Sequence, residues 1–269
     1  MWNWDYLIII GVLVAAMLVT KLVIWAYQAS GRDPMDLKVT SGKYNPVNFA
    51  TILIAYVAQT AVVYVAQVHI HGQPFAQLGF DANVAQGVVL GTLGGLVVFS
   101  LPKLIAFGAA QQTQFTSTWP RDEAPLYALG IFVILIVGLI LNSYIEELVF
   151  RAYPIEQLTD TALGAVLVIL ASAFLFSLVH HIIEPFNAQV FLMRFLVGVI
   201  FGELYVLTGS IWPLIGVHTG VNMGALMFTG KWRIGGVFHL EHDRAPLEAT
   251  LGWILYGGLI LGMGALLYL

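Results

Sequence analysis

The longest apolar run of the chain reads PLYALGIFVILIVGLILNSYIEELVFRAYPIEQ and covers residues 125–157. Its first part, up to Ile145, contains no charged side chain, and two acids and an arginine then follow within six residues. A transmembrane helix needs about 20 mostly apolar residues, so this run is long enough to cross a bilayer and to continue beyond it. The stretch therefore predicts a membrane-spanning helix that carries ionisable groups at membrane depth.

Seven further apolar runs of similar character surround this one, at residues 5–27, 47–68, 84–109, 161–182, 188–207, 210–229 and 248–268. Charged residues make up only 10% of the 269 residues, whereas soluble domains carry about 25%. Hydrophobic residues make up 59%, and the mean hydropathy is +0.86. Because unpaired backbone groups cannot face lipid, we predict an all-α, polytopic transmembrane helical bundle of about eight helices. Residues 1–269 are expected to form a single membrane domain.

Charge and cysteine content exclude several partners. The formal net charge of −4 and the pI near 5.9 offer no basic surface for nucleic acid, so the expected partners are the lipid bilayer and a membrane substrate. Cysteine is absent, which excludes disulfides and thiolate metal sites. The first apolar run lacks a basic leader and is too long for a signal peptide, so we expect a retained helix.

The positive loop charges predict an orientation. They lie in the first, third and seventh loops, at Arg32, Lys38, Lys43, Arg121, Lys231, Arg233 and Arg244. The positive-inside rule therefore places the odd loops in the cytoplasm and both termini outside. Four pairs of glycines spaced four apart suit close helix packing, at Gly91 and Gly95, Gly198 and Gly202, Gly216 and Gly220, and Gly258 and Gly262.

An acidic and basic cluster occupies the end of the long run. Glu147 and Arg151 are four apart with the acid first, which is the favourable spacing for a helical ion pair. Glu146 points about 100° away on the same helix. Ionisable groups at membrane depth cost at least ~2.5–3.5 kcal/mol each, so they indicate function by default. We interpret Arg151 as the partner that orients Glu147, which leaves Glu146 for proton transfer. The alternative is a structural salt bridge with a spare acid.

Two further clusters carry polar side chains on helix faces. Phe176 and His180 are one turn apart, as are His218 and Asn222. His218 and Asn222 are both able to donate hydrogen bonds to a developing oxyanion. The structural alternatives are a packed, hydrogen-bonded His180 and an interhelical hydrogen bond from Asn222.

The order EExxxR, then FxxxH, then HxxxN resembles the CPBP family, which comprises type II CAAX prenyl endopeptidases and bacteriocin-processing or abortive-infection (ABI) intramembrane proteins. The stretch GVIFGELYVLTGS at 198–210 and the pair Trp212-Pro213 are similar to the context of the third motif in that family. The resemblance covers residues 130–226, which we expect to form the catalytic core within the membrane domain.

The resemblance implies an intramembrane, metal-independent glutamic protease without a cofactor. Glu146 and His180 would activate a water, His218 and Asn222 would stabilise the oxyanion, and Glu147 and Arg151 would support them. The implied substrate is a peptide or a prenylated protein, with C-terminal CAAX processing as one form of the reaction. The implied location is the cell membrane of a prokaryote. The alternative function is a non-catalytic membrane scaffold or a bacteriocin self-immunity protein of the same fold.

Other chemistries find weaker support in the residues. Glu146, His180 and His218 would also suit a catalytic zinc, although there is no HExxH motif. Ser143 and Ser177 lie near the motifs, but neither sits in a GxSxG nucleophile elbow. A proton-coupled transporter is disfavoured because no internal repeat is present. The histidine pairs His69 and His71, and His239 and His242, are expected in loops and without a specific metal.

Overall fold

The computed structural model describes residues 4–37, 46–80, 83–117, 125–159, 162–181, 186–229 and 238–268. The long α-helices are α1 (Trp4–Ala29), α2 (Pro46–Val65), α3 (Val84–Gly108), α4 (Pro125–Glu147), α6 (Ala162–His180), α7 (Ala188–Thr208), α8 (Ile211–Thr229) and α9 (Ala245–Tyr268). Shorter elements are the 3₁₀ turns η1 (Pro34–Leu37) and η4 (Phe75–Leu78), the π-helical turns η3 (Ala66–Ile70) and η5 (Leu148–Ala152), the helix α5 (Tyr153–Leu158), and the strands β1 (Thr113–Ser117) and β2 (Phe238–His242).

The helices confirm the predicted polytopic all-α membrane bundle. Within the described residues, seven helical segments are long and apolar enough to cross a membrane, and α6 adds a shorter apolar helix over Gly164–His180. Each of the eight apolar runs therefore corresponds to a helix. Large apolar side chains such as Leu22 and Trp25 are exposed along the outer faces, where lipid is their natural solvent. The chain is a multi-pass integral membrane protein.

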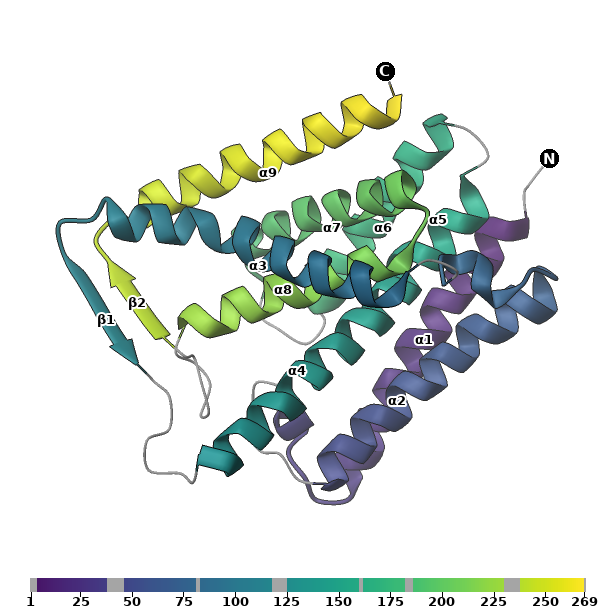
Figure 1. The fold of residues 1–269 in the computed structure, drawn as a ribbon. Coiled ribbons are helices and arrows are strands. Elements are labelled where there is room, and N and C mark those ends of the chain that lie inside the picture. The colour runs from purple at the N-terminus through teal and green to yellow at the C-terminus, as the bar shows by residue number, and fades with distance from the viewer. Residues whose placement is uncertain are drawn as a thin grey trace.

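The helix α8 lies at the centre of the bundle (Figure 1). It packs against α3 on one side and α4 on another, while α7 packs against α6 and α9. The helices α1 and α2 form a pair that contacts the α4 region. This arrangement brings the three motif-bearing helices, α4, α6 and α8, together in the interior.

Glycines permit the closest crossing, between α3 and α8. A Cβ atom on Gly91 would lie 2.6 Å from the carbonyl oxygen of Pro213, and one on Gly216 would lie 2.6 Å from that of Val88. Side chains at these positions would collide with backbone, so glycine is required. The α3–α8 pairs and the pair Gly198 and Gly202 thus confirm the predicted close packing.

The prediction for Gly258 and Gly262 is wrong. No atom of the described residues lies within 4 Å of a Cβ built on either glycine. The helix α9 lies at the periphery, and only 11% of the residues in its apolar stretch are buried. This pair of glycines therefore faces away from the neighbouring helices. Spacing alone does not reveal which side of a helix a neighbour occupies.

The two strands were not predicted from the sequence. They pair antiparallel, with Thr113 opposite His242 and Ser117 opposite Phe238. The segment 239–242, which was expected in a loop, therefore belongs to a strand, and His69 likewise lies inside η3 rather than in a loop. Strands of five residues are too short for their alternation to stand out in a sequence, and the pairing depends on helices far apart in the chain.

Residues 118–124 and 230–237 lie outside the described residues, as does 38–45. The loop charges Lys38, Lys43, Arg121, Lys231 and Arg233 belong to these segments. The orientation that they predict therefore stays a prediction.

Candidate active site

The helix α4 continues through the π-helical turn η5 into α5, and this continuous segment carries the first motif. The Nη1 atom of Arg151 lies 3.4 Å from Oε1 of Glu147, so the ion pair expected from the spacing is present. Both side chains have 0% exposed surface, whereas the Glu146 side chain keeps 21%. Single π-helical turns inside α-helices are frequent at functional sites. The segment thus supplies one fully buried, paired acid and one accessible acid.

Aromatic rings enclose the Arg151 guanidinium. Its carbon atom lies 4.0 Å from the ring centre of Phe176 and 5.7 Å from that of Phe201, within the range of cation–π attraction. Gly198 on α7 leaves room for the same group, because a Cβ there would lie 2.9 Å from Nη2. The arginine is therefore fixed by α6 and α7 as well as by its own helix.

His218 of α8 bridges the two acids. Its Nδ1 atom lies 2.6 Å from Oε1 of Glu147, and its Nε2 atom lies 3.5 Å from Oε2 of Glu146. A carboxylate only accepts hydrogen bonds, so Nδ1 carries the hydrogen and donates it. A buried carboxylate on one imidazole nitrogen fixes the tautomer and stabilises the imidazolium form. The contact between His218 and Glu147 was not predicted from the sequence.

His180 stands at the end of α6 with its tautomer set by the backbone. Its Nδ1 atom lies 2.8 Å from the carbonyl oxygen of Phe176, which can only accept, so Nδ1 is the donor. In the neutral ring, Nε2 then carries a lone pair. The charges of Glu146, Arg194 and His218 act on this imidazole. Within the described residues no direct hydrogen bond joins His180 to Glu146, so the two expected partners are near one another but not bonded.

Asn222 lies one helical turn after His218 on α8. Its amide makes no side-chain hydrogen bond to any residue that the structure describes. The predicted donation to an oxyanion requires an amide with unused donors, and Asn222 has them.

One hydrogen bond to Glu146, and a second one that supports it through Asn142, were missed by the sequence analysis. The Nδ2 atom of Asn142 lies 3.0 Å from Oε1 of Glu146, and the Tyr56 hydroxyl lies 2.8 Å from Oδ1 of Asn142. The spacing of four between Asn142 and Glu146 was a usable signal. Tyr56 comes from α2, and no sequence pattern pointed to it.

The hydroxyl groups of the two serines near the motifs make structural hydrogen bonds. Ser143 accepts a hydrogen bond from Thr219 at 3.2 Å, and Ser177 donates to the carbonyl oxygen of Ala173 at 3.0 Å. Neither forms a hydrogen bond with a histidine in the part of the chain that the structure describes. A serine nucleophile would need a base in contact.

No group of three or more His, Asp or Glu side chains within the described residues is placed to hold a metal ion. The absence of a cofactor stays a prediction, and a chelator tests the zinc alternative at Glu146, His180 and His218. Two of the paired histidines contact other side chains: His71 lies 3.0 Å from the Tyr153 hydroxyl, and His242 of β2 lies 2.9 Å from Glu248.

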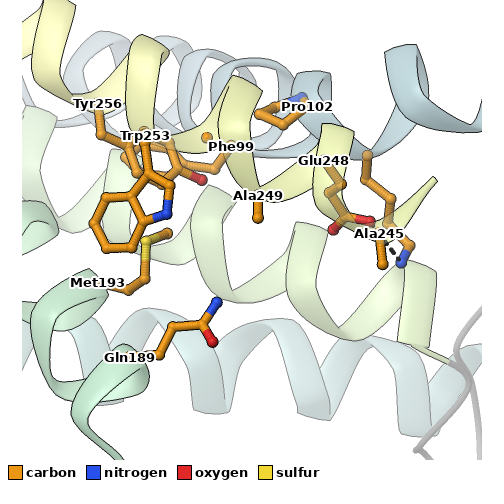
Figure 2. A pocket seen from close by; sticks show the side chains of 11 residues that line it. Phe99, Pro102, Gln189, Met193, Ala245, Glu248, Ala249, Trp253 and Tyr256 are labelled. Carbon is orange, nitrogen blue, oxygen red and sulfur yellow. Dashed lines mark ion pairs between the residues drawn. The ribbon is translucent and has the colours of Figure 1, made fainter.

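A separate cavity of about 310 Å³ opens between α3, α7 and α9 (Figure 2). Its walls include Phe99, Met193 and Trp253, and the ion pair of Lys103 with Glu248, 3.8 Å apart, lies at one end. None of the residues singled out as catalytic lines it.

One comparison with known proteins gives a family. Residues 128–224 match the family model described as Type II CAAX prenyl endopeptidase Rce1-like, close to the 130–226 expected from the motifs. No curated protein and no solved structure matched the chain. The match confirms the resemblance to the CPBP family, and the matched segment contains all seven residues that the three motifs specify.

Proposed function

We propose, from the membership of residues 128–224 in the type II CAAX prenyl endopeptidase Rce1-like family, that the chain is an intramembrane endopeptidase that uses a water activated by Glu146 and His180. The observation that carries the proposal is the position of His218 between two unlike acids. Glu147 is buried and paired with Arg151, while Glu146 keeps an accessible carboxylate. A catalytic base must be accessible to water and substrate, whereas the charged groups that support it act most strongly when they are shielded from solvent.

The first step is attack of water on the scissile carbonyl carbon. Glu146 accepts one proton of the water, and the unprotonated Nε2 of His180 helps to orient it. The new C–O bond forms as the C=O π electrons move to the carbonyl oxygen. The resulting oxyanion accepts hydrogen bonds from Nε2–H of His218 in its imidazolium form and from the Asn222 amide.

The second step is collapse of the tetrahedral intermediate. The C–N bond breaks, and its electron pair stays on nitrogen, which receives the proton held by Glu146. The oxyanion electrons re-form the carbonyl. Glu147 stabilises the imidazolium of His218 throughout, and Arg151 balances the charge of Glu147.

The proposed substrate is a protein whose C-terminal CAAX sequence carries a prenyl group. The family description supports it, and so does the multi-pass architecture, because a prenylated peptide partitions into the bilayer. The lipid chain would stay among the apolar side chains while the peptide enters the polar site. No metal takes part in this scheme.

The test is cleavage of quenched fluorescent peptides by purified, detergent-solubilised protein. The peptides share one sequence and carry a farnesyl group on the cysteine, no lipid, or a cysteine-to-serine change. We expect fast cleavage of the farnesylated peptide and at least ~10-fold slower cleavage of the other two peptides. A loss of about 1.4 kcal/mol in binding free energy lowers the affinity for the peptide tenfold. Equal cleavage of all three would remove the prenyl substrate but keep the protease. No cleavage by folded protein would favour the scaffold or self-immunity function.

A further inference from the structure

We propose that Tyr56 and Asn142 are positioning residues that assign the two oxygens of Glu146 to different tasks. The pair of hydrogen bonds holds Oε1 as a fixed acceptor and leaves Oε2 as the oxygen that takes the proton from water. The proposal rests on the proposed function, because it concerns the base of that reaction.

The direction of the hydrogen bonds follows from chemistry. A carboxylate oxygen only accepts, so the group of Asn142 that faces Glu146 at 3.0 Å must be its NH₂. The amide oxygen of Asn142 then faces the Tyr56 hydroxyl at 2.8 Å, which donates to it. The reverse orientation would set two acceptors against one another. Tyr56 thus prevents the amide from flipping, and the Asn142 donor stays on Glu146.

The second oxygen of Glu146 has a different surrounding. Oε2 lies 3.5 Å from Nε2 of His218 on α8 and accepts no hydrogen bond from the residues that the structure describes. Oε1 already accepts one from the amide, so it is the weaker base of the two. The asymmetry therefore aims the basic oxygen toward His218 and away from α2.

The charged and titratable groups around Glu146 come from five elements. Glu147 follows it in α4, Arg151 belongs to η5, His180 to α6, His218 to α8, and the Tyr56 phenol to α2. A Tyr56→Phe substitution removes only the phenol hydroxyl and leaves the other four groups in place. The variant therefore isolates the effect of the hydrogen bond from Tyr56 to Asn142.

Tyr56 also connects the N-terminal part of the chain to the candidate active site. It lies on α2, outside the matched segment 128–224, so a helix of the N-terminal part would complete the site. One turn along the same interface, Thr60 forms a second contact from α2 to α4, with its hydroxyl 3.3 Å from that of Tyr144. This second contact does not reach Glu146, which makes Thr60→Val a matched control.

The experiment compares the pH dependence of kcat and KM for wild type, Tyr56→Phe, Asn142→Leu, the double variant and Thr60→Val. Loss of one hydrogen bond predicts a kcat lowered about two- to tenfold in Tyr56→Phe with KM unchanged. Its acidic limb moves to higher pH, because a carboxylate with a weakened donor protonates more easily. The double variant should be no slower than Asn142→Leu, since Tyr56 acts only through Asn142. Thr60→Val should keep the wild-type profile.

An unshifted limb in Tyr56→Phe, or fully additive effects in the double variant, would overturn the proposal. A readout without turnover separates it from the proposed function. Infrared difference spectra against Glu146→Gln isolate the carboxylate band of Glu146, and its titration midpoint should rise in Tyr56→Phe but not in Thr60→Val. If the midpoint rises in Tyr56→Phe but the wild-type protein cleaves no peptide, the positioning role of Tyr56 and Asn142 would be supported and the protease function rejected. If the midpoint is unchanged in a protein that cleaves peptide, the protease function would stand and the positioning role would be rejected.

Discussion

Replacing Arg151 by methionine tests the buried ion pair most severely. The side chains of Glu147 and Arg151 have no exposed surface and lie 3.4 Å apart, so the variant leaves an acid in the interior without its cation. Breaking a buried pair by removing one partner costs about 3–5 kcal/mol. We expect the lower half of this range, because Nδ1 of His218 still donates to Glu147 at 2.6 Å. For a protein of this size, a loss of about 3–4 kcal/mol corresponds to a fall in Tm of about 6–16 °C.

The double variant Glu147→Gln with Arg151→Met is the matched comparison. It removes both charges, and the glutamine oxygen still accepts from His218, so it should recover most of the lost stability. Thermal unfolding of the detergent-solubilised proteins, followed by circular dichroism, measures both. If Arg151→Met melted within about 2 °C of wild type, or if the double variant were less stable than the single one, the reasoning would be refuted.

Three further predictions concern neighbouring positions. Gly198→Ala places a Cβ 2.9 Å from the buried guanidinium and should cost about 1–3 kcal/mol and lower activity, whereas Gly258→Ala, with open space around it, should change neither Tm nor activity. Alanine at Ser143 or Ser177 should keep kcat within about threefold, because neither hydroxyl contacts a base; a loss of 100-fold or more would revive a serine mechanism. Asn222→Ala should lower kcat by about 10²–10³ with KM little changed, and an unaltered kcat would remove Asn222 from the oxyanion site.

The helices were predictable because lipid allows few structures. Each apolar run had to form a helix, and the structure places a helix over each. The Glu147 and Arg151 pair was predictable for a similar reason, since both residues belong to one helix and their geometry follows from spacing. The family match confirms the resemblance to the CPBP family that the motifs indicated. The catalytic roles, the absence of a cofactor and the prokaryotic cell membrane stay predictions.

The contacts between helices were not predictable. The pairing of His218 with Glu147 and the approach of Tyr56 to Asn142 depend on how α8 and α2 rotate against α4. A single sequence records which residues share a helix face but not which face meets which neighbour. Gly258 is a second example of this limit. Its spacing from Gly262 is the same as in the closely packed pairs, but no described residue packs against it.

The central claim is that a glutamate and a histidine, without a metal, activate the water. The measurement is cleavage of the farnesylated CAAX peptide by wild type, Glu146→Ala and His180→Ala, each with and without a chelator. The account predicts cleavage by wild type that the chelator does not change, and a loss of at least about 100-fold in each variant, typical for removal of a general base. Wild-type cleavage that is abolished by the chelator and restored by zinc would contradict it, as would full activity in Glu146→Ala.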